Sequence, residues 1–188
     1  MSAESAVVLV EGESDRRALV AAARRLEVDL VAAGADVVAM HGVTNLRHHL
    51  AELDARPAPP RILGLFDIGE QAHVARMLAE AGREASGSER DLEALDFFAC
   101  ALDLEDELIR AAGADVVEGV LADHRDLLRF RTFQRQPAQR GRSIEAQLRR
   151  FAGTASGRKT WFAADVVDVL PLDRVPPPMR RLFSALGS

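Results

Sequence analysis

Short apolar segments alternate with segments of helical periodicity over the first 113 residues, and this alternation most narrows the folds open to the chain. The apolar segments are residues 6–11, 37–40, 61–67 and 95–102. Near-continuous apolar runs of this length are typical of parallel strands that are buried on both faces. Helical patterns lie between them, and a further one runs through Ala112. The sequence therefore predicts an α/β fold with a four-stranded parallel sheet flanked by helices.

The remaining residues carry only helical patterns. The predicted helices are residues 116–121, 127–133, 144–151, 161–170 and 179–186. Glycine-rich and proline-rich segments separate the last three, as expected at helix boundaries. The sequence thus predicts two parts, an α/β domain over residues 1–113 and an α-helical C-terminal extension over residues 114–188.

Acidic residues follow three of the four predicted strands. The pairs are Glu11 with Asp15, Asp67 with Glu70, and Asp103 with Glu105. In a parallel α/β sheet, ligands bind outside the carboxyl ends of the strands. Hard cations such as Mg²⁺ are held there by carboxylates, water and substrate phosphate. Each acid taken alone is readily explained as a solvated or helix-capping residue, but the three pairs together favour a metal site.

Charge divides the chain unevenly. Residues 1–123 carry 11 basic and 24 acidic side chains, whereas residues 124–160 carry 10 basic and 2 acidic ones. A basic segment joined to an acidic body suits a protein that meets a polyanion with its arginines. The alternative is a solvated helical face whose arginines pair with acids of the same chain.

Two further features of the composition bear on function. Lys159 is the only lysine among 24 basic residues, and a lysine is a compact, mobile point charge that arginine does not replace. A single cysteine, Cys100, excludes a disulfide framework or a cysteine-based zinc site. No apolar run reaches the ~18 residues of a membrane span, so we expect a soluble, cytoplasmic protein with no membrane partner.

Several motifs resemble one known family. Strand-end motifs Val10-Glu11-Gly12-Glu13-Ser14-Asp15 and Asp67-Ile68-Gly69-Glu70 resemble the TOPRIM domain of topoisomerases, primases and OLD (overcoming lysogenization defect) nucleases. Within that group, the run Asp103-Leu104-Glu105 and a late Gly157-Arg158-Lys159 that opens a helix look most like the OLD branch. The resemblance extends over nearly the whole chain. It implies a Rossmann-like TOPRIM fold and a nuclease that hydrolyses DNA phosphodiester bonds with Mg²⁺ or Mn²⁺.

The resemblance also implies a role for individual residues. Glu11 and Lys159 would be catalytic, Glu11 by handling a proton and Lys159 by neutralising charge on the scissile phosphate. The implied metal ligands are Glu11, Asp15, Asp67, Glu70 and Glu105. The basic segment adds arginines expected to bind nucleic acid, namely Arg131, Arg135, Arg140, Arg142 and Arg158.

The sequence departs from the family pattern in two places. The third strand of the family usually ends in Asp-x-Asp, but here Gly69 holds the second acidic position and Glu70 is the expected substitute. OLD proteins usually carry an ATPase, yet this sequence has no G-x-x-x-x-G-K-[ST] loop, so no ATP site is expected in it. A separate ATPase and a second copy of the chain are candidate partners. Two alternatives to the nuclease stay open: a weak or inactive TOPRIM module that binds nucleic acid or an ATPase, and another TOPRIM phosphoryl transferase.

Overall fold

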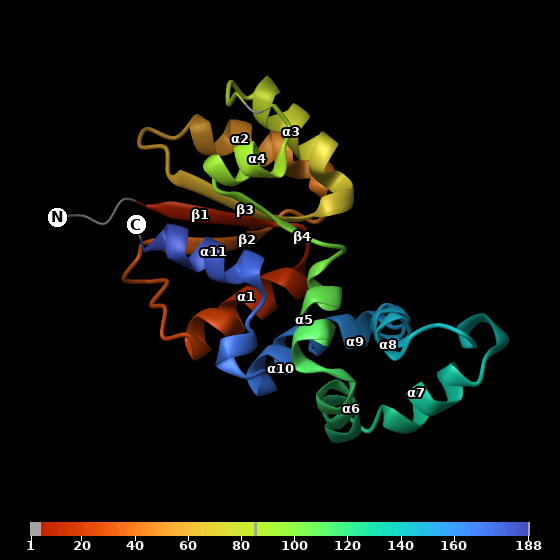
Figure 1. Cartoon of the computed structure of the whole chain (residues 1–188). Coiled ribbons are helices and arrows are strands. Elements are labelled where there is room, and N and C mark those ends of the chain that lie inside the picture. Colours follow the sequence, from red (N-terminus) through yellow and green to blue (C-terminus); the bar gives the residue numbers. More distant parts are fainter. Residues whose placement is uncertain (1–4, 85, 188) are drawn as a thin grey trace.

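A computed structural model describes residues 5–84 and 86–187 of the chain. Four parallel strands form one sheet in the order β2-β1-β3-β4. The strands are β1 (Ala6–Val10), β2 (Ala35–Ala39), β3 (Arg61–Asp67) and β4 (Phe97–Cys100). Helices cover both faces, so the molecule has three layers (Figure 1). The expected α/β fold class is confirmed.

Alternate residues of each strand face opposite helical layers, which explains the near-continuous apolar runs. Val8 and Leu63 belong to one buried cluster, whereas Leu9 and Ile62 belong to the other. One glycine in these runs has a packing reason. A Cβ atom at Gly64 would come within 2.5 Å of the Phe97 ring on the neighbouring strand, so only glycine fits there.

The helices on one face of the sheet come from the first half of the chain. They are α2 (Leu46–Asp54), α3 (Gln71–Glu80) and α4 (Glu89–Ala94), and they lie together above the sheet in Figure 1. The polar segment of residues 82–88 leads into α4. The hydroxyl oxygen of Ser88 accepts a hydrogen bond from the Asp91 amide and so caps this short helix.

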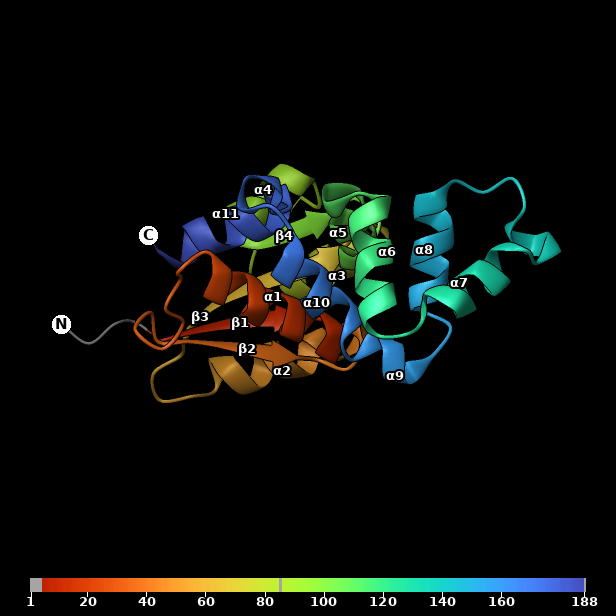
Figure 2. The ribbon, with the colours of Figure 1, turned by 90° about the horizontal axis from the view of Figure 1, so that it is seen from below.

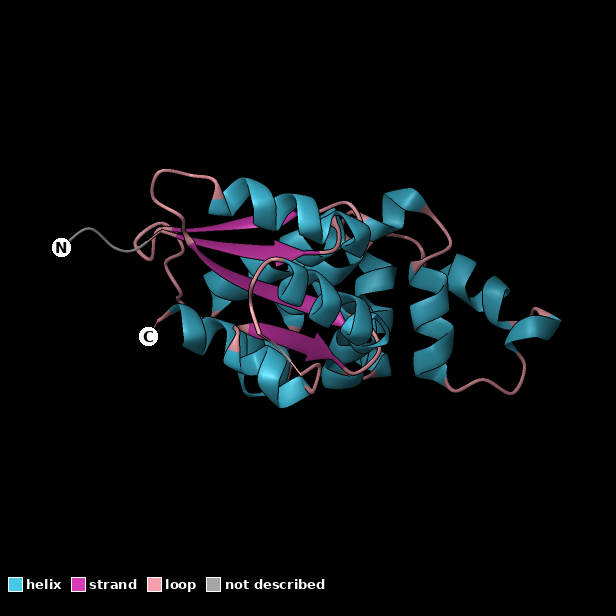
Figure 3. Ribbon diagram, turned by 90° about the horizontal axis from the view of Figure 1, so that it is seen from above, coloured by secondary structure: helices cyan, strands magenta, loops and turns pink. Residues whose placement is uncertain are grey.

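The helices on the other face come from the beginning, the middle and the end of the chain. They are α1 (Glu13–Arg25), α5 (Leu104–Ala112), α10 (Phe162–Val169) and α11 (Pro177–Leu186). Figure 3 shows how these layers enclose the strands. Buried residues on both sides of residue 113, such as Val8 and Phe162, belong to one cluster. The C-terminal helices therefore complete the core of the α/β body, and the division at residue 113 stays a prediction.

The remaining helices extend away from the sheet. They are α6 (Ala114–Asp123), α7 (Leu127–Gln134), α8 (Ile144–Ala152) and the short α9 (Ser156–Lys159). Figures 1 and 2 both show α7 and the loop after it projecting from the body, and we call residues 127–143 the arm. In the described part of the chain, no helix has the length and apolar character needed to cross a membrane.

Candidate metal and phosphodiester site

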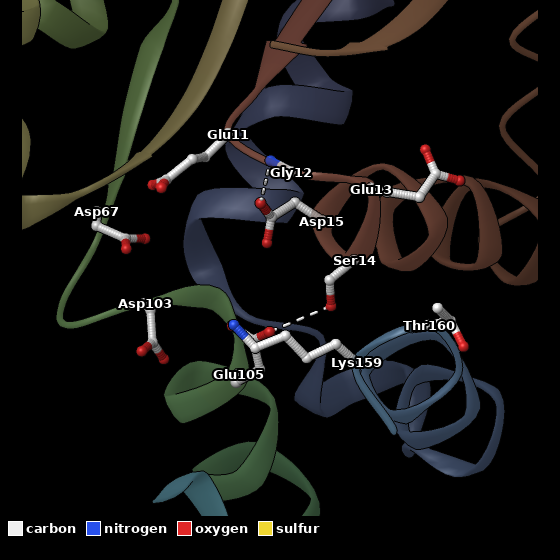
Figure 4. Close-up of a pocket in the computed structure, with 10 residues that line it drawn as sticks. All are labelled: Glu11, Gly12, Glu13, Ser14, Asp15, Asp67, Asp103, Glu105, Lys159 and Thr160. Carbon is white, nitrogen blue, oxygen red and sulfur yellow. Dashed lines mark hydrogen bonds between the residues drawn. The ribbon is translucent and has the colours of Figure 1, made fainter. Parts of the chain in front are cut away.

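A cavity of about 350 Å³ lies at the carboxyl edge of the sheet (Figure 4). Its lining residues come from the turn after β1, the end of β3, the start of α5 and the end of α9. They are Glu11, Gly12, Glu13, Ser14, Asp15, Asp67, Asp103, Glu105, Lys159 and Thr160. Parallel strands bring their carboxyl ends to the same edge, which is why acids distant in sequence meet here. The only lysine of the chain faces them across the cavity.

Hydrogen bonds fix the turn after β1 to α1 and α5. Gly12 is the N-cap of α1, and its amide donates to the Asp15 carboxylate at 2.9 Å. This contact turns the Asp15 side chain back toward the strand end. The Ser14 hydroxyl donates a hydrogen bond to the Glu105 carboxylate at 3.1 Å. The turn after β1 and the start of α1 thus position the carboxylates of Asp15 and Glu105 by hydrogen bonds.

The carboxylates in the cavity repel one another. Burial, followed by the charge of Glu105, raises the pKa of Asp15 to about 7. Burial, followed by the charge of Asp103, raises the pKa of Asp67 to about 7. Burial and Asp103 also raise the pKa of Glu105. Such crowding costs free energy unless protons or a cation neutralise it, so the cavity attracts cations.

Glu13 lines the cavity but does not share this role. Its carboxylate accepts hydrogen bonds from Arg16 at 2.8 and 2.9 Å and from Arg17 at 3.0 Å, and in Figure 4 it points away from the other acids. These arginines lower the pKa of Glu13 to about 2. Arg17 also donates to the Thr160 carbonyl at 3.0 Å, which ties α1 to the segment that carries Lys159.

The carboxylate oxygens of the cavity are the ligand atoms that a divalent cation requires. Carboxylate oxygens are the ligands that Mg²⁺ and Mn²⁺ prefer, so the chemistry of the cavity fits a hard cation. As the side chains of the described residues are placed, no three of their carboxylate, imidazole or thiol groups lie close enough to hold one ion together. Side-chain rotation would therefore have to accompany cation binding.

Most of the predicted metal and catalytic residues line one cavity. Glu11, Asp15, Asp67, Glu105 and Lys159 all do so. Lys159 is the last residue of α9 and does not open a helix as expected, because α10 begins only at Phe162.

One predicted ligand is misplaced and one cavity residue was missed. Glu70 is not among the residues that line the cavity, so it does not take the place of the acid missing at position 69. Asp103 lines the cavity although only Glu105 of that pair was assigned to the metal. The signal for Asp103 was present in the sequence, since it directly follows the predicted strand of residues 95–102.

The predicted nucleic-acid-binding arginines divide into two groups. Arg135, Arg140 and Arg142 are exposed on the arm, and Arg131 is exposed there while paired with Glu118 at 2.5 Å. Arg158 must be corrected: it is only 6% exposed, and its guanidinium binds Asp126 at 2.7 Å and stacks on the Phe151 ring. Because it is buried and fully engaged, Arg158 stabilises the helices around it and does not face a ligand.

Comparison with known proteins agrees with this fold. Residues 4–63 match the family model of the TOPRIM domain of overcoming lysogenization defect protein-like proteins. A search of curated protein sequences found no significant match.

Two solved structures have the same fold. One is the C-terminal region of the Burkholderia pseudomallei OLD protein, with 18% identity and a TM-score of 0.70, covering 98% of this chain and 97% of that one. The other is the C-terminal region of the Xanthomonas campestris pv. campestris OLD protein, with 21% identity and a TM-score of 0.71, covering 99% of this chain and 96% of that one.

Residues 4–63 thus resemble an OLD-like TOPRIM domain, and acids lie at the carboxyl edge of the parallel sheet. The fold of the whole chain matches that of the C-terminal regions of OLD proteins. The family resemblance inferred from the sequence is confirmed.

Proposed function

We propose that this protein is a metal-dependent endonuclease that hydrolyses DNA phosphodiester bonds with Mg²⁺ or Mn²⁺. One observation carries the proposal: acids from three strand ends and the only lysine of the chain line the same cavity. The OLD-like TOPRIM match supports a nuclease-type module.

Each group in the cavity has a role suited to phosphodiester hydrolysis. Glu11, Asp15, Asp67 and Glu105 would hold the cation, which supplies Lewis-acid activation of water and of the phosphate when bound. The Lys159 ammonium, on the opposite wall, would stabilise negative charge that develops on the scissile phosphate. Glu11 lies at the end of the central strand β1 and would accept the proton of the attacking water.

The arm supplies a surface for the DNA backbone. Residues 127–143 contain five arginines and no acidic residue. Exposed arginines bind phosphates without reading sequence, so we expect affinity that falls steeply with salt. The substrate would then extend from the cavity along α8 to the arm.

Cleavage of supercoiled plasmid tests the proposal. The purified protein is incubated with plasmid and Mg²⁺ or Mn²⁺, in parallel with Glu11→Ala and Lys159→Ala. Nicking that requires the cation and is lost in both variants supports the nuclease. Absence of nicking under all conditions, with the protein folded, rejects it.

The second candidate is a TOPRIM module that binds nucleic acid or an ATPase without cutting. Two observations favour it: Gly69 replaces an acid of the family pattern, and no three potential ligands among the described residues converge. DNA retardation in a gel without any nicking supports this candidate. Retention of an ATPase with neither nicking nor DNA retardation supports its protein-binding form.

A further inference from the structure

One of the cavity acids already forms an ion pair with an arginine. The guanidinium of Arg149, in the last turn of α8, forms an ion pair with Asp103, and its Nε lies 2.6 Å from Asp103 Oδ2. The other carboxylate oxygen, Oδ1, accepts the Asp106 amide at 2.8 Å and caps α5. Both oxygens of Asp103 are therefore engaged before any ligand arrives.

Asp103 lines the same cavity as Asp67 and Glu105. A positive charge beside Asp103 therefore reduces the repulsion between the carboxylates of the cavity. Arg149 supplies that charge from the helix that directly follows the arm.

The contact is also open enough to change. The side chain of Arg149 is 41% exposed and that of Asp103 is 19% exposed. An ion pair reached by solvent contributes little net stability, so a stronger ligand can displace it. Arg158 on the same side of the molecule provides a contrast, because it is buried against its acid.

We propose that Arg149 is the resident counter-cation of the acidic cavity and that it exchanges with the divalent cation. In this exchange Asp103 would become free to help hold the cation, and the released guanidinium would become free to contact a phosphate of the DNA. The exchange rests on the proposed function, since it concerns the same cation and the same DNA. Arg149 would then be a positioning residue: it would link cation binding in the cavity to DNA binding by α8 and the arm.

Calorimetric titration of the full chain with Mn²⁺ measures the exchange without any need for cleavage. Arg149→Ala removes the competing charge, so Mn²⁺ should bind roughly tenfold more tightly than to wild type. Arg149→Lys keeps a charge and should bind close to wild type. Arg150→Ala is the matched control, because Arg150 is the exposed neighbour and its loss should change affinity by less than about twofold.

Unchanged or weaker Mn²⁺ binding by folded Arg149→Ala overturns the exchange, since a purely structural pair would loosen Asp103 when it is broken. Thermal melting checks that each variant is folded. In an Asp103→Asn background, Arg149→Ala should add no further change in Mn²⁺ affinity. An additive effect in that background would also contradict the exchange.

DNA binding gives a second readout. With Ca²⁺ present, Arg149→Ala should weaken binding to a short duplex by about threefold to tenfold, and without Ca²⁺ the loss should be smaller. An equal loss under both conditions overturns the release of Arg149.

The outcomes separate this inference from the proposed function. Wild type that binds Mn²⁺ while Arg149→Ala binds no better rejects the exchange and leaves the nuclease intact. Mn²⁺ binding seen only in Arg149→Ala supports exchange in its strongest form. No binding in either protein rejects both.

Discussion

The acidic cavity and the arm use charge in opposite ways. The cavity places its carboxylates at the edge of a parallel sheet, where burial, followed by repulsion from neighbouring acids, raises the pKa values of Asp15 and Asp67. The arm carries its arginines on a projecting helix and loop, where they are exposed. Chemistry needs fixed groups in a partly desolvated site, whereas a grip on a polyanion needs only accessible charge.

Arginines between the two regions belong fully to neither. Arg158 is buried and bound to Asp126, and Arg149 reaches from α8 to a cavity acid. Position in the fold, and not residue type, therefore decides whether an arginine stabilises helices, balances the cavity or meets the substrate.

The largest effect is expected on the free energy of unfolding, when a substitution breaks the buried ion pair next to the start of the arm. Arg158→Ala leaves Asp126 buried without its main partner, which should lower the free energy of unfolding by about 3–5 kcal/mol. Urea denaturation measures this, with exposed Arg135→Ala as the control at about 0.5 kcal/mol or less. If stability were unchanged and DNA binding were weakened, Arg158 would bind DNA and would not stabilise the fold.

The next largest effect is expected on DNA affinity, and it tests whether the arm and the cavity act independently. Replacing Arg135, Arg140 and Arg142 together by alanine should weaken duplex binding roughly a hundredfold and reduce the salt slope of log K by about 0.9 per lost contact. Fluorescence anisotropy at several salt concentrations gives both values. Mn²⁺ affinity should not change in this variant, and a joint loss of both affinities would show that the two regions are not separable.

A third prediction concerns pH and tests the burial and mutual repulsion of the cavity carboxylates. The folded-state pKa of Asp15 is raised to about 7 from an ordinary value of 3.8, so the folded protein holds a proton that the unfolded chain releases. The associated stability is present below about pH 4 and is lost as pH rises through 7. Without divalent cations, Asp15→Asn should therefore be more stable than wild type at pH 8, by about 2 kcal/mol, and not at pH 4.

Melting curves at pH 4 and pH 8 test this sign, and asparagine keeps an oxygen that can accept the Gly12 amide. Added Mg²⁺ should raise the melting temperature of wild type at pH 8 and shrink the difference between the two proteins. A variant that is less stable than wild type at pH 8 without cations contradicts repulsion at this site.

The smallest effect is expected on Mn²⁺ affinity, when a substitution restores the second acid of the family pattern. A Cβ atom at Gly69 meets no atom within 4 Å, so an acid fits there. Gly69→Asp should tighten Mn²⁺ binding by about threefold to tenfold because the number of charged ligands rises. Gly69→Asn matches its size without the charge and should leave the affinity near wild type; equal affinities in the two variants would show that position 69 does not reach the cation.

The sequence was sufficient for the sheet and for most of the cavity because both rest on local patterns. Apolar runs ending in acids fixed the strands, and parallel order alone brings Glu11, Asp67 and Glu105 to one edge. Pairings between distant residues were not predictable. Arg158 with Asp126 and Arg149 with Asp103 depend on how the C-terminal helices return to the sheet, which no local pattern encodes.

The most direct measurement of the central claim is the rate of cation-dependent plasmid nicking by Lys159→Arg. This variant keeps the positive charge but replaces the compact ammonium that faces the cavity acids. We predict that nicking falls at least about tenfold relative to wild type while DNA affinity stays the same. A Lys159→Arg protein that nicks as fast as wild type would contradict a catalytic role for the only lysine of the chain.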